Sequence, residues 1–108
     1  DVNKASELKK RINTINKYLK ISIFLTSDYI ISDCDIIINA TSLGLKQNDK
    51  VPFDVTMSSK NCVIADIIMY PEETELLKQA KSIGRPVHYG KNMIESQIDL
   101  VGNFLNLW

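Results

Sequence analysis

Cysteine, glycine and histidine are scarce in this sequence, and each shortage argues against a class of site. The 108 residues include two cysteines, four glycines and one histidine. Cys34 and Cys62 have no neighbouring cysteine or histidine at metal-ligand spacing, so we expect buried free thiols and no metal site. No glycine-rich phosphate loop is present, so residues upstream of Asp1 would have to hold the pyrophosphate of a bound dinucleotide.

An excess of one charge and a long apolar run are also missing. Thirteen basic and thirteen acidic side chains cancel, and they are scattered along the chain. This pattern offers no electrostatic footprint for nucleic acid or for an anionic membrane surface. No apolar run approaches the roughly 20 residues that cross a bilayer, and no charged leader precedes an apolar segment. We therefore expect a cytoplasmic protein without a nucleic-acid or membrane partner.

Helical and strand patterns alternate along the chain. Apolar residues at three- and four-residue steps predict helices over 3–19, over 76–83 and from 91 onward. Asn3 is expected to cap the first helix, and Gly84 to end the second. Apolar and β-branched runs predict strands over 21–25, 35–39, 62–69 and 86–89, with at most a short helix over 28–33. The order predicts one α/β domain with a doubly wound parallel sheet, in which the continuous apolar run 35–39 is covered on both faces.

Several polar residues follow the predicted strands, where parallel sheets bind their ligands. The loop after the strand 35–39 carries Thr41 and Ser42, whose small hydroxyl side chains suit either a ligand contact or an ordinary turn. Asp66 lies within an apolar strand and must be paired when buried, so we favour a bond to amides or hydroxyls of a neighbouring loop over catalysis. Ile67 and Ile68 suit core packing, and they could also present an apolar surface to a ring.

Two polar residues occur near the end of the chain. Gln97 lies on the apolar stripe of the last predicted helix, so we expect it to face inward, where backbone groups or a polar ligand would satisfy its amide. His88 has no Asp, Ser or Cys close in sequence, and a structural role is expected for it.

Three segments together carry a resemblance to a known family. They are the sequence Asp35 to Leu45, the sequence Ala65 to Pro71 followed by Thr74, Leu76 and Leu77, and finally Gly90 with Met93 and Gln97. In this order and spacing they resemble the shikimate dehydrogenase family, over about residues 3 to 108. The resemblance implies that 1–108 is the C-terminal part of an NAD(P)-binding, Rossmann-like domain, the second half of a dinucleotide-binding unit. It implies NADP as cofactor, with NAD possible.

The resemblance also implies roles for single residues. Thr41 and Ser42 would lie near the nicotinamide ribose, and Ile67 and Gly90 would line the nicotinamide pocket. Gln97 would bind a hydroxyl of the substrate ring. A final group of residues departs from the family. Met69 stands where the family usually has a tyrosine that contacts the substrate carboxylate, and Ile98 stands where glycine or alanine is common.

The implied activity is hydride transfer between NADPH and 3-dehydroshikimate, in aromatic amino acid biosynthesis, by a monomer or homodimer. The family's catalytic lysine and aspartate belong to an N-terminal substrate domain, which this chain lacks together with the glycine-rich loop. We therefore expect no catalytic residue here and no activity from the chain alone. The first residue is Asp1 and not methionine, which suggests a piece of a longer protein. Two alternatives stay open: a related dehydrogenase of quinate or another hydroxylated ring acid, and a non-catalytic α/β binding module.

Overall fold

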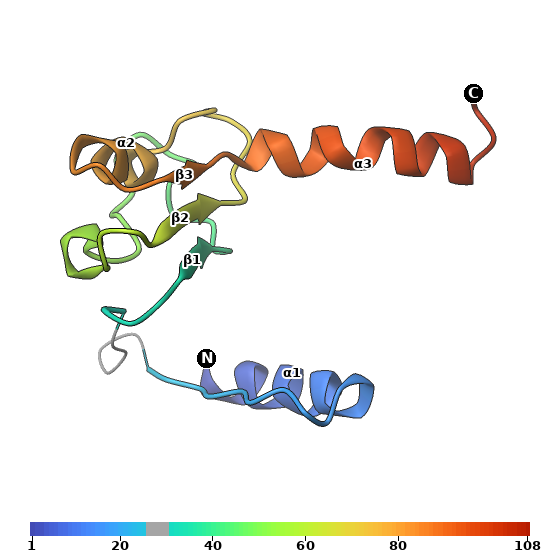
Figure 1. Cartoon of the computed structure of the whole chain (residues 1–108), viewed down its shortest axis with the longest axis horizontal. Coiled ribbons are helices and arrows are strands. Elements are labelled where there is room, and N and C mark those ends of the chain that lie inside the picture. The colour runs from blue at the N-terminus through green and yellow to red at the C-terminus, as the bar shows by residue number, and fades with distance from the viewer. Residues whose placement is uncertain (26–30) are drawn as a thin grey trace. The chain divides into compact units, whose positions relative to one another are not determined.

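The computed structural model describes residues 1–25 and 31–108 (Figure 1). The chain divides into two compact units, Asp1–Ile30 and Ile31–Trp108. The predicted short helix over 28–33 falls partly on residues outside the described ones, and within the described part Ser32 and Asp33 form a turn. The two units are described separately.

The first unit is built on one amphipathic helix. Helix α1 spans Val2–Ile15 and begins at Asp1, whose Oδ1 accepts hydrogen bonds from the amides of Asn3 and Lys4 at 2.9 and 3.4 Å. The expected cap Asn3 is therefore wrong by two residues, because a carboxylate precedes it and takes the free amides of the first turn. The helix ends at Asn16, which adopts an extended conformation, and so it is shorter than the predicted 3–19.

The predicted strand over 21–25 does not form. The segment has no regular secondary structure and pairs with no strand among the described residues. It runs back along α1, and a shallow apolar groove between the two is lined by Ala5, Leu8, Lys9, Ile12, Ile21, Ser22, Ile23 and Phe24. Strand propensity reflects how well a side chain fits a pleated surface, and a strand also needs a neighbour to share its hydrogen bonds. Among the described residues the segment 21–25 has no such neighbour.

The second unit is a parallel three-stranded sheet with the order β1-β2-β3. Strand β1 spans Ile36–Asn39, β2 spans Val63–Asp66 and β3 spans Val87–His88. The register pairs Ile36 with Val63, and hence Asn39 with Asp66 at the carboxyl ends of the two strands. The α/β fold with a Rossmann-like parallel sheet is thus confirmed, and all three strands occur at their predicted places.

Strand β2 is shorter than the predicted 62–69 for a local reason. The Ile67 amide still donates to the Asn39 carbonyl at 3.2 Å, but the next amide, that of Ile68, donates to the Asp66 side chain at 3.0 Å. The carboxylate thereby replaces the next strand partner and turns the chain away from the ladder.

Helix α2 and the long loop before β2 cover one face of the sheet. Helix α2 spans Glu75–Ser82, and a short 3₁₀ helix, η1, spans Val55–Met57. The core between them and the sheet consists of Val55, Cys62, Ile64, Leu76, Leu77 and Ala80. Burial of a valine, leucine or isoleucine side chain stabilises a fold by about 1.5–3 kcal/mol. The predicted ending of α2 is confirmed, because Gly84 follows Ile83 with φ +79°, a conformation that glycine adopts without strain.

The opposite face of β1 is not covered within this unit. Ile36 and Ile38 are 57% and 60% exposed, whereas Ile37 packs against the core. Coverage on both faces, expected from the continuous apolar run, is therefore not met by residues 31–108. Both thiols are free, Cys62 being fully buried and Cys34 half-buried. Burial raises the pKa of the Cys62 thiol.

Helix α3 spans Gly90–Phe104 and follows β3 after one residue, Tyr89. It runs on from the carboxyl edge of the sheet, away from the strands (Figure 1). Gln97 and its apolar neighbours Ile94, Ile98 and Val101 are all exposed. The prediction that Gln97 faces inward is therefore wrong for this unit, because no other element in residues 31–108 packs extensively on α3. None of the described helices is both long and apolar enough to cross a membrane.

Candidate functional site

Three chain segments meet at the carboxyl edge of the sheet, and each carries residues predicted to bind a ligand. The loop after β1 carries Thr41 and Ser42, the loop after β2 carries Ile67 and Met69, and α3 begins at Gly90. In a parallel sheet this edge is where ligands bind, because all strands and their following loops open toward it. The fold thus brings the predicted cofactor residues to one edge.

The first two loops are joined by a buried polar network. Asn39 and Asp66 end β1 and β2 as register partners and are 3% and 2% exposed. The Asn39 Nδ2 donates to both Asp66 carboxylate oxygens at 3.3 Å. Asp66 also accepts from the Ile68 amide at 3.0 Å and from the Thr74 hydroxyl at 2.8 Å. The predicted structural role of Asp66, fastening neighbouring strand ends through amides and hydroxyls, is confirmed.

The loop after β1 is held in turn by Asn39. The Asn39 Oδ1 accepts from the Thr41 amide at 3.1 Å and from the Thr41 hydroxyl at 2.7 Å. The Thr41 hydroxyl accepts from the Leu43 amide at 3.1 Å. Thr41 and Ser42 are both exposed residues at the sheet edge. Sequence reasoning missed the role of Asn39, whose only signal was an asparagine at the end of an apolar strand.

The start of α3 lies directly against the end of β2. A Cβ atom added to Gly90 would lie 2.5 Å from the Ile68 carbonyl oxygen and 2.7 Å from that of Ile67. Such distances are far inside van der Waals contact, so only glycine permits this approach. Packing alone therefore explains why residue 90 is glycine. It also brings the backbone of α3 beside Ile67, whose side chain is 39% exposed.

The two predicted substrate residues lie apart from each other. Met69 follows Ile67 in the loop after β2 and is 43% exposed. Gln97 is seven residues beyond Gly90, which puts it about 10 Å further along the helix axis at 1.5 Å per residue. It lines an apolar groove together with Ile94, Ile98, Val101, Gly102, Leu107 and Trp108. The described residues bring Thr41, Ile67 and Gly90 together, and Gln97 stands outside that group.

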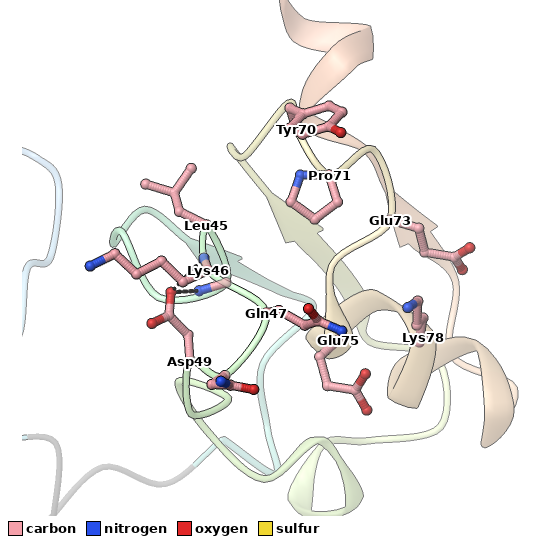
Figure 2. Close-up of a pocket in the computed structure, with 11 residues that line it drawn as sticks. Leu45, Lys46, Gln47, Asp49, Tyr70, Pro71, Glu73, Glu75 and Lys78 are labelled. Carbon is pink, nitrogen blue, oxygen red and sulfur yellow. Dashed lines mark hydrogen bonds between the residues drawn. The ribbon is translucent and has the colours of Figure 1, made fainter.

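A separate cavity of about 650 Å³ opens beside this edge, and it contains none of the predicted residues (Figure 2). It is lined by Gly44, Leu45, Lys46, Gln47, Asn48, Asp49, Tyr70, Pro71, Glu73, Glu75 and Lys78. Asp49 closes its loop by accepting from the amides of Gly44 and Lys46 at 3.0 and 2.9 Å. These bonds, that from Lys46 first, hold the pKa of Asp49 below its ordinary value.

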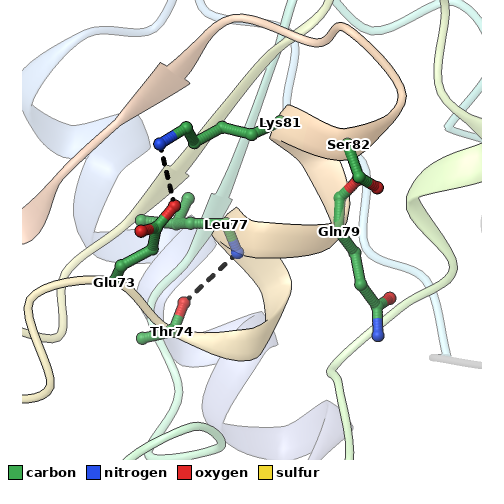
Figure 3. A network of polar contacts seen from close by, with 6 residues as sticks. All are labelled: Glu73, Thr74, Leu77, Gln79, Lys81 and Ser82. Carbon is green, nitrogen blue, oxygen red and sulfur yellow. Dashed lines mark hydrogen bonds and ion pairs between the residues drawn. The ribbon is translucent and has the colours of Figure 1, made fainter.

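Two acidic residues of the cavity wall bond to side chains outside the cavity lining. Glu73 forms an ion pair with Lys81 at 3.1 Å, which raises the pKa of Lys81 (Figure 3). Glu75 accepts from the Gln79 side chain at 3.2 Å. Carboxylates and lysines are mixed along the wall, so they do not converge on one kind of ligand. The carboxyl edge of the sheet remains the candidate site.

Among the described residues no cluster of three or more histidine, cysteine or acidic side chains has the geometry to hold a metal ion. His88 is exposed. The chemistry on offer at the candidate site is therefore hydrogen bonding by Thr41 and Ser42, together with the apolar surface of Ile67 and Met69. These groups can bind and orient a ligand, and none of them is a strong general acid or base.

The curated relatives of this chain are dehydrogenases of shikimate or of quinate and shikimate. No protein-family model matches the chain. A shikimate dehydrogenase (NADP(+)) of Pelagibacter ubique is 40% identical over 90 residues, which cover 83% of this chain and 31% of that protein. A quinate/shikimate dehydrogenase (NAD(+)) of Corynebacterium glutamicum is 33% identical over 79 residues, covering 72% of this chain and 28% of that protein.

Two solved structures are similar as well. Quinate dehydrogenase from Corynebacterium glutamicum in complex with NAD matches with a TM-score of 0.55 and 34% identity, covering 60% of this chain and 23% of that one. The ligand-free 5-ketofructose reductase of a Gluconobacter strain matches with a TM-score of 0.52 and 41% identity, over 56% of this chain and 22% of that one. The chain spans about a third of the length of the curated relatives it matches. On these similarities the chain belongs to the shikimate dehydrogenase family of oxidoreductases.

Proposed function

We propose that this chain supplies the nicotinamide side of the dinucleotide site in an NADP-dependent shikimate dehydrogenase. The reaction is hydride transfer between NADPH and 3-dehydroshikimate. One observation carries the proposal: the loop after β1, the loop after β2 and the start of α3 are locked together at the carboxyl edge of the sheet. Asn39 and Asp66 tie the two loops, and Gly90 lets α3 touch the end of β2.

The residues at this edge fit the nicotinamide half of a dinucleotide. Thr41 and Ser42 offer exposed hydroxyls for the ribose or the carboxamide, and Ile67 offers an exposed apolar side chain for a ring face. Gly90 adds no side chain between that surface and the start of α3. When bound, the nicotinamide supplies the hydride. The chain's own residues orient the ring and keep water from one side of it.

Met69 and Gln97 are the proposed substrate contacts. Gln97 carries two donors and one acceptor, which suit a ring hydroxyl, and it is accessible on α3. Met69 lies two residues beyond Ile67 and would meet the substrate's carboxylate side with an apolar group. The catalytic acid and base are proposed to come from outside this chain, because a proton must move at the reacting carbonyl and none of the residues at the candidate site suits that work.

A second candidate is a quinate or quinate/shikimate dehydrogenase that uses NAD. The similarity to two proteins of that kind from Corynebacterium glutamicum favours it. Met69, in place of a tyrosine, also favours a shift in ring-acid preference. In either case we propose a cytoplasmic enzyme of aromatic ring-acid metabolism, monomeric or homodimeric, whose partner is a small molecule.

The test is turnover by the complete protein. Reduction of NADP⁺ and NAD⁺ is followed with shikimate and then with quinate. Turnover of shikimate with NADP⁺ supports the first proposal, and turnover of quinate with NAD⁺ supports the second. Binding of neither dinucleotide would rule out both.

Gln97→Ala provides a residue-level test in the same assay. It should raise the KM for the ring acid about tenfold or more, because a hydroxyl of the substrate loses its partner. Gln79→Ala on α2 is the matched control. Among the described residues the Gln79 side chain bonds only to Glu75, so the substitution should leave the KM unchanged. An unchanged KM in Gln97→Ala would remove this residue from the substrate site.

A further inference from the structure

The amide orientation of Asn39 is set by its buried partners. Its Nδ2 lies 2.9 Å from the Leu43 carbonyl oxygen and 3.3 Å from each Asp66 carboxylate oxygen. A carbonyl only accepts hydrogen bonds, and so does a carboxylate, so the NH₂ group must face them. The reverse orientation would place the amide oxygen of Asn39 against three acceptor oxygens, one of the Leu43 carbonyl and two of the Asp66 carboxylate. Asn39 Oδ1 therefore faces the opposite way, toward Thr41.

The orientation of Asn39 fixes that of the Thr41 hydroxyl. Oδ1 cannot donate, so at 2.7 Å the hydroxyl of Thr41 must give its proton to Asn39. One lone pair of the same hydroxyl accepts from the Leu43 amide at 3.1 Å. A hydroxyl has one proton and two lone pairs, so a single acceptor position is left. Thr41 is exposed at the sheet edge, and this remaining acceptor position is the one that a ligand could use.

We infer that Thr41 binds the dinucleotide as a hydrogen-bond acceptor, and that Asp66 and Asn39 are positioning residues that impose this polarity. The group it recognises is a donor on the nicotinamide half of the cofactor, either a ribose hydroxyl or the carboxamide NH₂. The inference rests on the proposed function, because it assumes a dinucleotide at this edge. It extends that function by naming the direction of the bond and the residues that determine it.

The chain contains a matched control for this arrangement. Asp54 Oδ1 accepts from the Thr56 amide at 2.9 Å and from the Thr56 hydroxyl, at 2.6 Å, the same local pattern as Asn39 and Thr41. Thr56 lies in η1, before β2, and not in a loop that follows a strand. Thr56→Val thus removes the same local hydrogen bond without touching the candidate site.

The first measurement is affinity for the reduced dinucleotide in the complete protein. Thr41→Val should weaken binding about three- to tenfold, the loss expected for one neutral hydrogen bond. Thr41→Ser should restore most of it, and Thr56→Val should bind as the wild type does. Equal affinity in Thr41→Val and wild type would overturn the inference.

The second measurement tests the positioning role through a double-mutant cycle. Asp66→Asn keeps the shape but lets an NH₂ group replace one acceptor oxygen beside Asn39. Only the Leu43 carbonyl then still selects the orientation of the Asn39 amide, so the direction of the bond from the Thr41 hydroxyl is held less firmly. Asp66→Asn should weaken dinucleotide binding, and adding Thr41→Val should cost little more. Two independent effects that simply multiply would overturn the positioning role. If Asp66→Asn does not fold, Asn39→Ala provides the cycle, because it removes the oxygen that takes the proton of the Thr41 hydroxyl.

A third arm identifies the donor and separates this inference from the proposed function. The affinity series is repeated with the 3-acetylpyridine analogue of the dinucleotide, in which an acetyl group replaces the carboxamide. If Thr41→Val then costs nothing, the carboxamide is the donor; if the loss persists, the donor is a ribose hydroxyl. A wild-type protein that binds no dinucleotide contradicts the proposed function. A wild type that binds, with Thr41→Val unaffected, contradicts only the polarity proposed for Thr41.

Discussion

The hydroxyl of Thr74 lies 2.8 Å from the Asp66 carboxylate, so one buried hydrogen bond joins the beginning of α2 to the end of β2. The same oxygen accepts from the Leu77 amide at 3.4 Å and caps the helix (Figure 3). Thr74 is fully buried and Asp66 is 2% exposed. The Thr74 side chain thus caps α2 and also bonds the carboxylate that joins the loops after β1 and β2.

Thr74→Val should therefore destabilise the protein strongly. It leaves the shape nearly unchanged but removes a hydrogen bond to a buried carboxylate and the cap of α2, which together cost about 2–4 kcal/mol. Chemical denaturation of the complete protein measures the free energy of unfolding. Thr14→Val is the control: its exposed hydroxyl bonds the Arg11 carbonyl at 2.6 Å, and its loss should fall within about 0.5 kcal/mol. Equal losses in the two variants would show that the Asp66 bond contributes nothing special.

Gly90→Ala should be harmful although alanine is the better helix former. The added Cβ would lie 2.5 Å from the Ile68 carbonyl oxygen, so α3 must move away from the end of β2. Overpacking of this kind costs about 1–3 kcal/mol, more than the gain of about 1 kcal/mol from helix propensity. Unfolding and dinucleotide affinity should both be affected. In Gly84→Ala no atom lies within 4 Å of the new Cβ and only the positive φ of +79° is strained, so that variant should lose stability without loss of affinity.

The loop that closes on Asp49 should respond to acid. Backbone amides of Lys46 and Gly44 hold the folded pKa of Asp49 below its ordinary value of 3.8. A depressed pKa means that the carboxylate stabilises the fold above pH 3.8 and that this contribution is lost as the pH falls through the folded pKa. Asp49→Asn should thus be less stable than the wild type at neutral pH, and the gap should narrow below about pH 3.8. The urea midpoints of the wild type and Asp49→Asn, measured from neutral pH to below pH 3.8, give this difference in stability. Asp99→Asn, at an exposed residue, is the control. A gap that stays constant with pH would contradict the role of the charge.

How much of this site could be predicted from sequence differs between neighbouring residues. Asp66 was predictable, because a carboxylate inside an apolar strand must find donors wherever the strand ends. Its partner Asn39 was not, since the pairing depends on the strand register that opposes residues 27 positions apart. Gly90 was expected to face a cofactor, and the structure adds a backbone contact that by itself requires glycine.

The errors have a common physical origin. A periodic pattern shows which face of a segment is apolar, but it does not show what covers that face. The stripe of α3 around Gln97 was therefore expected inside, and it is exposed in residues 31–108. The run 21–25 has strand propensity, but no described strand pairs with it. Element types were predicted well where both partners lie within the chain, as in β1, β2 and β3.

Met69 offers the most direct test of substrate preference. It is 43% exposed in the loop after β2, and family resemblance puts a tyrosine hydroxyl here, bound to the substrate carboxylate. A hydrogen bond to a charged group contributes about 1.5–3 kcal/mol, or about one to two powers of ten in affinity. Met69→Tyr in the complete protein should therefore lower the KM for shikimate about tenfold or more.

The neighbouring tyrosine supplies the control for that experiment. Tyr70 is 87% exposed. Its hydroxyl would contact the substrate only if the loop turned this side chain, and not that of Met69, toward the substrate. Tyr70→Phe should leave the KM for shikimate unchanged if the position of Met69 is the one that faces the carboxylate. A raised KM in Tyr70→Phe, with no gain in Met69→Tyr, would mean that the loop is shifted by one residue and that Tyr70 already supplies the missing hydroxyl.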